Sequence, residues 1–296
     1  MLLSVLIPTH NHDCTELVSE LSVILPPDAE ILVGDDASTD PQVKRRLEKL
    51  GDMPCCRLYQ ATQNLGRAAI RNRLADEARG EWLIFIDSDA KLMQQDFIQR
   101  YLEARQTDVV CGGTAAPRSC PSPEVSLRFR YESHYWATRT AQARSLSPYV
   151  CFTTFNFMIR RAAFMAIRFN EECRQYGHED TLFGIDLKKG GISLQHIDNA
   201  LIHMGLEPNP VFLQKTEESL RALIGMDPAV AEGSRILRWR RRLDRLRLTP
   251  LVRVLHKILG PLEKRQLCSR HPDLHIFTLY KIGYLCSLDE SAVSHP

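Results

Sequence analysis

Several features of common protein classes are missing from this chain of 296 residues. No run of about 18 apolar residues occurs, so we expect no membrane-spanning helix. Residues 2–7 form an apolar stretch without a basic segment before it, which is too short for a secretory signal peptide. No internal repeat or low-complexity tract is visible. We therefore expect an ordinary folded protein, because 44% hydrophobic residues can supply a sizeable core.

The nine cysteines are scattered along the chain, and their number is odd. None of them forms a CxxC pair or has the spacing of zinc ligands. Free thiols in a reducing compartment are the simpler interpretation. We therefore expect a cytoplasmic protein, with any membrane contact peripheral and at the cytosolic face.

The net charge is small, at +2, but it is unevenly distributed. Residues 235–265 carry 11 Lys and Arg against two acids, a net charge of +9, which leaves −7 for the rest of the chain. This asymmetry indicates a separate surface near the end of the chain. We predict a main domain over residues 1–228 and a basic, amphipathic helical region over residues 229–296.

Strand-like and helix-like segments alternate along the first half of the chain. Apolar runs at 2–7, 30–33, 56–59 and 82–86 are typical of buried strands, and helical spacing lies between them. This alternation predicts an α/β fold with a mostly parallel sheet. Further on we expect a helix at 125–143, a strand at 150–159 and strands within 192–203. The proline-bearing segment 114–148 is either a ligand-binding loop or an ordinary surface excursion.

Two carboxylates, in Asp87-Ser88-Asp89, directly follow the apolar run 82–86. The carboxyl ends of strands are where open α/β sheets bind ligands. Paired oxygen donors there suit Mg²⁺ or Mn²⁺ together with the phosphates of a substrate. Aspartates also cap helices, but this pair predicts a metal-dependent enzyme that acts on a phosphorylated donor.

Four other polar clusters could take part in the same chemistry. After the second strand, Asp35 and Asp36 could accept hydrogen bonds from a nucleoside or from the local backbone. Arg67, which follows Asn64 and Gly66, offers a cation for phosphates. The helix start at 177–180 is either a cap or the place of a general base. His203 is either a core histidine or a ligand for Mn²⁺ beside carboxylates.

Together these stretches resemble family 2 glycosyltransferases with the GT-A fold. The matching motifs lie at residues 4–11, 31–40, 64–67 with 69–75, 80–89, 155–161 and 177–180, and the resemblance covers about residues 1–206. It implies a Rossmann-like, mostly parallel sheet flanked by helices over residues 1–228. It also implies an inverting enzyme that moves a sugar from a nucleoside-diphosphate sugar, UDP-linked, to a hydroxyl of a glycan or lipid-linked acceptor in surface polysaccharide synthesis.

The resemblance also implies roles for individual residues on the donor side. Asp36 would bind the nucleobase of the donor with support from Asp35. Asp87 would lie close to the ribose or reach the metal through water. The other donor-binding candidates are Pro8, Thr9, His10, Asn64, Arg67 and Ser88.

For the metal and the catalytic step, Asp89 would be the principal ligand of Mn²⁺ or Mg²⁺. His203 would be a second metal ligand, from late in the sequence. Asp180 would be the catalytic base, and Glu179 would bind the acceptor. His178 stands where family members often have a small or aromatic residue.

Two other functions compete with this one. A sugar-1-phosphate nucleotidyltransferase would carry a Gly-rich loop with Lys or Arg after the first strand, whereas Pro8-Thr9-His10-Asn11 stands there. A non-catalytic, membrane-associated scaffold would not need acids at every one of these positions.

The basic region has an amphipathic pattern. Ile236, Trp239, Leu243 and Leu246 follow at steps of three and four residues, with arginines around them. Residues 235–265 would therefore either dock on the main domain or bind an anionic membrane surface. We expect no nucleic acid partner, because no aromatic stacking platform accompanies the arginines.

Overall fold

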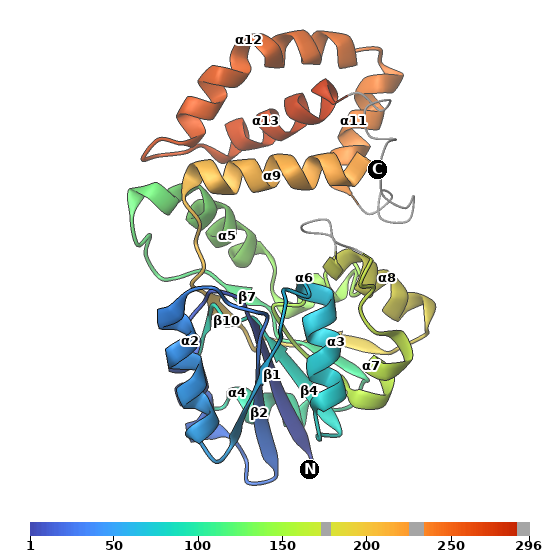
Figure 1. Ribbon diagram of the computed structural model, residues 1–296. Coiled ribbons are helices and arrows are strands. Elements are labelled where there is room, and N and C mark those ends of the chain that lie inside the picture. Colours follow the sequence, from blue (N-terminus) through green and yellow to red (C-terminus); the bar gives the residue numbers. More distant parts are fainter. Residues whose placement is uncertain (173–178, 225–233, 289–296) are drawn as a thin grey trace. The chain divides into compact units, whose positions relative to one another are not determined.

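The computed structural model describes residues 1–172, 179–224 and 234–288 (Figure 1). Two compact units divide the chain. The first unit draws on Met1–Ala116, Trp136–Arg174 and Glu179–Gly205, and the second on Pro117–Tyr135 and Leu206–Pro296. The predicted boundary between residues 228 and 229 falls outside the described residues and stays a prediction.

A seven-stranded sheet in the order β3-β2-β1-β4-β8-β6-β9 forms the centre of the first unit. Four neighbouring strands are parallel: β1 (Leu3–Thr9), β2 (Ala29–Asp35), β3 (Cys56–Gln60) and β4 (Trp82–Ile86). Next to β4, β8 (Asn156–Arg160) runs antiparallel to β4 and to β6 (Val109–Cys111), and β9 (Leu194–His196) is parallel to β6. This mixed, mostly parallel sheet confirms the predicted α/β class.

The strand β1 ends at Thr9 and so includes Pro8, which lies beyond the apolar run at 2–7 from which the strand was predicted. Pro8 pairs with Gly34 in the ladder to β2, but the ladder between β1 and β4 covers only Leu3 to Leu6. Because no neighbour on the β4 side requires an N–H from residue 8, proline is tolerated at this position.

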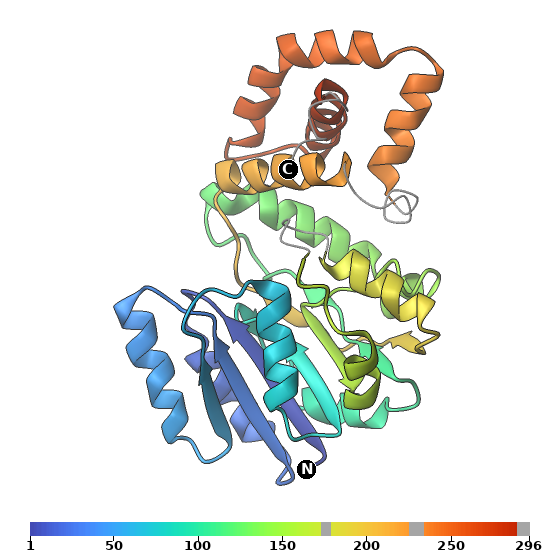
Figure 2. The same ribbon diagram turned by 45° about the vertical axis from the view of Figure 1, so that its right-hand side comes forward.

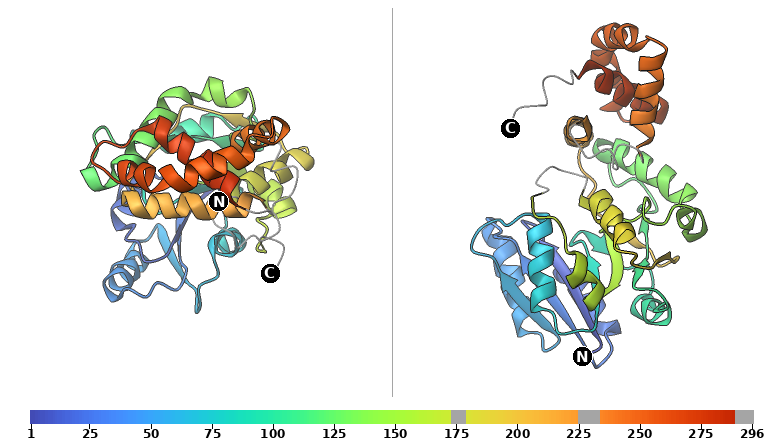
Figure 3. Two further views of the ribbon diagram at one scale, coloured as in Figure 1. Left: turned by 90° about the horizontal axis from the view of Figure 1, so that it is seen from above. Right: turned by 90° about the vertical axis from the view of Figure 1, so that its right-hand side faces the viewer.

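Helices cover both faces of this sheet (Figures 1 and 3). Val5 and Ile7 point into a core shared with α1 (Thr15–Ile24), α2 (Pro41–Glu48) and α4 (Phe97–Glu103). Leu6 and Phe85 point the other way, toward α3 (Arg67–Glu77), α7 (Arg161–Ile167) and α8 (Glu179–Lys189). Burial on both faces explains why the strands are continuous apolar runs. Phe85 stacks on Phe157 of β8 with ring centroids 4.9 Å apart.

A small second sheet lies at the end of β4. It has the order β5-β10-β7, formed by β5 (Ala90–Lys91), β10 (Leu201–His203) and β7 (Thr114–Ala115). β10 is antiparallel to β5, and His203 pairs with Ala90. This pairing brings a segment from much later in the chain beside the residues that follow β4.

Two predictions for residues 125–159 are wrong in detail. The helix expected at 125–143 is two helices, α5 (Ser126–Thr138) and α6 (Ala141–Ser145), because the Thr140 side chain accepts a hydrogen bond from Ala143 N and starts a new helix. The strand expected at 150–159 begins at Asn156, since residues before it form turns such as the one closed by Cys151 N and Ser147 O.

The second unit is helical. It contains α9 (Asn209–Ile224), α11 (Arg235–Arg245), α12 (Thr249–Leu267) and α13 (Leu274–Ser287), with the first part of α5. The first three of these surround α13, which Figure 2 shows nearly end-on. Phe212, Leu267, Phe277 and Tyr280 form the core of this unit. Among the described helices, none combines the length and the apolar character needed to cross a membrane.

The arginines of α11 do not all face solvent, contrary to the amphipathic pattern in the sequence. Arg240 is buried and donates to the Leu285 carbonyl of α13 at 2.7 Å. Meanwhile Trp239 and Leu246, expected on the apolar face, are 53% and 60% exposed. The helix therefore packs on α13 partly through an arginine, and part of its apolar face is left in solvent.

Candidate functional site

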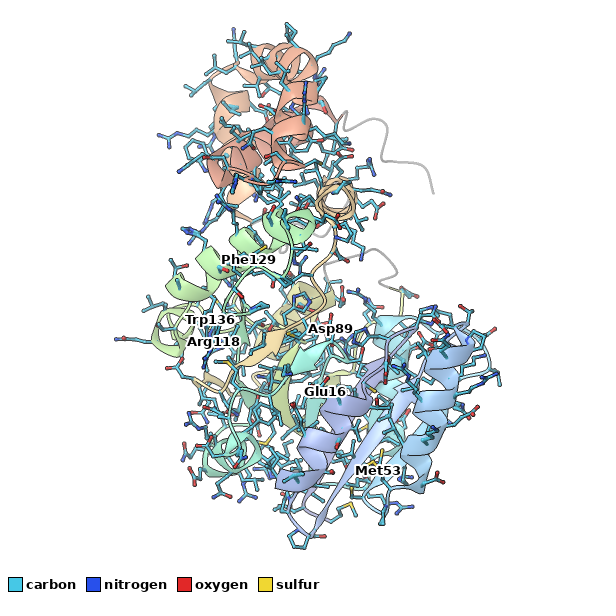
Figure 4. The ribbon with its side chains drawn as sticks, turned by 90° about the vertical axis from the view of Figure 1, so that its left-hand side faces the viewer. Glu16, Met53, Asp89, Arg118, Phe129 and Trp136 are labelled. Carbon is cyan, nitrogen blue, oxygen red and sulfur yellow. The ribbon has the colours of Figure 1, made fainter. Side chains whose placement is uncertain are left out.

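The predicted site residues gather at one edge of the main sheet. The parallel strands β1, β2 and β4 all end at this edge. Because β8 runs in the opposite direction, its first residues, preceded by Thr154, reach the same edge. Figure 4 shows Asp89 at this edge and Met53, which precedes β3, at the other. Open α/β sheets bind ligands at the carboxyl ends of their strands.

On the donor side, Asp36 ties two loops together. Its carboxylate accepts hydrogen bonds from Leu65 N at 2.6 Å and from Gly66 N at 3.0 Å, just before α3 begins. The Asp36 carbonyl is 2.8 Å from Nδ1 of the exposed His10 and 3.4 Å from the Asn64 side-chain amide. The buried Asp36 thus fixes the backbone of the loop before α3. Its predicted contact with a nucleobase stays a prediction.

The other donor-side residues are held by local hydrogen bonds. Asp35 accepts from Ser38 N at 2.9 Å, and the buried Thr9 hydroxyl donates to the His12 carbonyl at 2.7 Å. Asn11, which stands in the motif after the first strand but was assigned no role, has a φ of 52° and accepts from Thr39 N at 2.6 Å. Asn tolerates this left-handed conformation better than most residues. These bonds place the loops after β1 and β2 side by side, and Pro8, near the end of β1, is half-buried.

Asp89 and His203 meet across the small sheet. The Nε2 atom of His203 is 3.1 Å from Oδ2 of Asp89, and their side chains are 11% and 29% exposed. Burial opposes ionisation of Asp89, but the hydrogen bond and charge of His203 outweigh it and lower the pKa of this carboxyl. Gly205 makes room for the pair, because a Cβ at that position would fall 2.0 Å from the same oxygen.

Asp87 has a different environment. Its Oδ1 atom accepts a hydrogen bond from the buried Arg71 of α3 at 2.5 Å. Burial nevertheless raises the pKa of Asp87, with the Asp89 charge adding to the effect against the attraction of Arg71. The two acids therefore differ in their partners and in the direction of their pKa shifts: Asp89 contacts an imidazole, and Asp87 contacts a guanidinium. Ser88 lies half-buried between them.

The acidic pair at the start of α8 lies at the same sheet edge. Thr154 is buried, and its hydroxyl donates to Oδ1 of Asp180 at 2.7 Å. Burial and the neighbouring Glu179 charge raise the pKa of Asp180 to about 6. Glu179 is buried and pairs with the more exposed Arg67 at 3.3 Å. Gly177 and His178 lie outside the described residues.

The donor set fits a divalent cation that is shared with a substrate. In the part of the chain that the structure describes, no three His, Cys, Asp or Glu side chains converge as a complete metal site. Asp89 and His203 supply a carboxylate oxygen and an imidazole nitrogen, both of which Mn²⁺ accepts. Mg²⁺ and Mn²⁺ sites in enzymes of phosphorylated substrates complete their coordination with phosphate oxygens and water.

Three residues of this site were not predicted from the sequence. Arg71 lies in an ordinary helical stretch, and nothing there indicates that its side chain is buried. Thr154 and Gly205 stand in segments without a repeating pattern. Thr154 precedes β8 and Gly205 follows β10. The pairing of these two strands brings both residues beside acids that are distant in the sequence.

Comparisons with known proteins agree with this arrangement. Residues 4–168 match the family model described as glycosyl transferase family 2. A search of curated proteins gave no match. TarS 1-349 from S. aureus, solved with UDP-GlcNAc, is similar with a TM-score of 0.51 and 20% identity, over 79% of this chain and 71% of TarS 1-349.

The mannosyltransferase PcManGT from Pyrobaculum calidifontis, solved with GDP-Man and Mn²⁺, has a TM-score of 0.59 and 15% identity. This likeness covers 96% of this chain and 85% of PcManGT. At these identities the two structures show only that the fold is shared, and this fold is of the GT-A type. The family model covers more than half of the chain. The protein therefore belongs to glycosyl transferase family 2, and is a glycosyltransferase with a GT-A fold.

Proposed function

We propose that the protein transfers a sugar, with inversion, from a nucleoside-diphosphate sugar to an acceptor hydroxyl. The observation that carries this proposal is the joint position of the Asp89–His203 pair and the Thr154–Asp180 pair at one sheet edge. The first pair suits a cation that binds a diphosphate, and the second suits a base. A transferase of this kind needs both.

A UDP-linked donor is proposed, because the family resemblance implies it and TarS was solved with UDP-GlcNAc. A GDP-linked donor is the other candidate, since PcManGT was solved with GDP-Man. The loops joined by Asp36 would hold the nucleoside, with Pro8, Thr9, His10 and Asp35 around it. Asn64, Arg67, Asp87 and Ser88 would hold the rest of the donor.

Asp180 has the properties that a general base requires. It must be ionised to accept the proton of the acceptor hydroxyl, and a pKa of about 6 keeps it mostly ionised at neutral pH while leaving it basic enough to act. As the acceptor oxygen bonds to the anomeric carbon, the bond from that carbon to the diphosphate oxygen breaks. Glu179, held by Arg67, is proposed to bind the acceptor.

Asp89 and His203 would hold Mn²⁺ or Mg²⁺, with Asp87 near the ribose or reaching the cation through water. When bound, the cation would neutralise the charge that develops on the leaving diphosphate. PcManGT, solved with Mn²⁺, supports this proposal. Arg71 keeps the Asp87 carboxylate oriented.

A panel of UDP- and GDP-sugars tested for Mn²⁺-dependent hydrolysis and transfer would test this function. We expect Asp89→Ala to abolish Mn²⁺-dependent UDP binding in calorimetry and Asp180→Asn to abolish transfer. Asp186→Asn, on the same helix α8 and with no assigned role, is the matched control and should leave transfer intact. Undiminished transfer by Asp180→Asn would contradict the assigned base.

The same assays separate the competing functions. Release of pyrophosphate from a nucleoside triphosphate would indicate a sugar-1-phosphate nucleotidyltransferase. Absence of metal-dependent nucleotide binding would indicate a non-catalytic scaffold. For the acceptor we propose a glycan or a lipid-linked glycan of surface polysaccharide synthesis, used at the cytosolic face of a membrane.

A further inference from the structure

The helix α12 exposes a row of aliphatic side chains. Six of them, here called the α12 outer row, are Leu251, Val254, Leu255, Ile258, Leu259 and Leu262, with exposed fractions from 43% to 65%. Successive members lie three or four residues apart or are neighbours, so they share one face of the helix. An exposed apolar surface of this extent marks an interaction site more often than an ordinary surface.

The other face of α12 is the one that packs within the second unit. Gly260 and Leu267 are buried there. His256 packs edge-on against the Tyr280 ring, with centroids 5.2 Å apart. A Cβ at Gly283 of α13 would fall 2.5 Å from His256 Nδ1. Because α13 occupies this face, the α12 outer row is not needed for the core of the unit.

Basic residues accompany this apolar surface. Residues 235–265, all within the described part of the chain, carry a net charge of +9. On α12 itself, Lys257 and Arg265 are exposed. The two acids of the segment are engaged locally: Glu263 is 3.2 Å from His256 Nδ1, and Asp244 accepts a hydrogen bond from Thr249. The segment that carries the α12 outer row therefore has a large excess of positive charge, although Arg240 is buried and Lys264 pairs with Glu217.

We propose that the α12 outer row and its basic surroundings dock on an anionic phospholipid bilayer. Aliphatic side chains would enter the boundary of the acyl chains while the cations remain at the headgroups. Pairing with a second copy of the chain would cover the same row, but it would bring two segments of +9 together, and like charges repel. An anionic leaflet supplies the opposite charge.

This inference deepens the proposed function and rests on it only for the lipid-linked acceptor. It also narrows where the sequence placed the contact. The sequence assigned the contact to residues 235–265 as a whole, whereas the structure shows the longest exposed aliphatic row within that range on α12. Docking through α12 would hold the enzyme at the surface where a lipid-linked acceptor is found.

Flotation of the full chain with vesicles tests the docking. We expect binding to phosphatidylcholine vesicles with about 30% phosphatidylglycerol, little binding to pure phosphatidylcholine, and weaker binding at about 0.5 M NaCl, because salt screens the attraction. The double variant Ile258→Glu/Leu262→Glu should bind at least about tenfold more weakly, since two aliphatic side chains that would enter the bilayer are lost.

Leu279→Glu, on α13 and 60% exposed, is the matched control and should keep its vesicle binding. Circular dichroism and thermal melting would show that each variant is folded. Equal binding of the double variant and the wild type, or equal loss in Leu279→Glu, would overturn the proposal. So would a dimer in sedimentation that the double variant abolishes without any change in vesicle binding.

Hydrolysis of the donor in solution separates this proposal from the proposed function. The double variant should retain full Mn²⁺-dependent hydrolysis, because its substitutions lie outside the residues assigned to the donor, the cation and the base. Loss of vesicle binding with intact hydrolysis supports the docking surface. A chain that binds vesicles but hydrolyses no sugar nucleotide would refute the proposed function and leave the docking surface standing.

Discussion

The hydrogen bond from Thr154 to Asp180 should set the lower pH limit of activity. The proposed base, Asp180, would work only when ionised, so activity should be lost as the pH falls through its pKa, which lies at about 6. The Thr154 hydroxyl, 2.7 Å from the carboxylate, stabilises the ionised form and so lowers this pKa. Thr154→Val removes the hydroxyl and keeps the shape, so the pKa should rise.

The size of the effect follows from the charge on the carboxylate that accepts the hydrogen bond. A hydrogen bond to a charged group contributes about 1.5–3 kcal/mol, and one pKa unit corresponds to about 1.4 kcal/mol. The pKa should therefore rise from about 6 to about 7–8. At pH 7 the ionised fraction would then fall from about nine-tenths to between about one half and one tenth, a loss of about two- to tenfold in rate.

The assay is sugar transfer at saturating donor and Mn²⁺, measured from pH 5 to pH 9. Thr154→Val should lose activity at pH 7 and recover most of it at pH 9, whereas Thr154→Ser, which keeps a hydroxyl, should follow the wild type. A uniform loss at every pH would show that Thr154 is structural. An unchanged acid limb would refute the reasoning outright.

Two further substitutions probe the rest of the site. Gly205→Ala should displace the Asp89 carboxylate, because the new Cβ would lie 2.0 Å from its oxygen; calorimetry should show Mn²⁺ affinity lowered by about 10- to 100-fold, while Gly51→Ala, with nothing within 4 Å, should not change it. Arg71→Met removes a buried cation and leaves the half-buried Asp87 carboxylate unpaired, and should lower the free energy of unfolding in urea by about 2 kcal/mol. Arg73→Met removes an exposed pair on the same helix and should cost less than about 0.5 kcal/mol; equal costs would contradict this account.

Much of the fold could be predicted because its signals are local. Each parallel strand is a buried apolar run, and the acids stand where the run ends, so the position of Asp36 or Asp89 at a strand end follows from the neighbouring residues. The family motifs are local in the same sense. Their order along the chain is enough to indicate the class of fold.

The parts that could not be predicted depend on contacts between distant segments. The strands β5 and β10 have two and three residues, too few for a periodic pattern, and yet they decide which acid meets His203. The amphipathic pattern of α12 shows that one face is apolar, but which face is buried depends on where α13 lies. Arg71 and Arg240 can be buried because each donates a hydrogen bond to a specific acceptor, Asp87 and the Leu285 carbonyl respectively. No pattern in the sequence indicates these acceptors.

The pairing of β10 with β5 also has a consequence for the order in which the enzyme becomes active during synthesis. Asp89 and His203 are separated by 114 positions, and long-range contacts of this kind form late, after the entropy of closing the intervening loop has been overcome. A nascent chain that has emerged only as far as β9 already contains both acids of Asp87-Ser88-Asp89 and the predicted base, but not the imidazole. If Asp89 and His203 hold the cation, as proposed, this capacity would arise only with β10, and a partly made chain could not yet act on the donor.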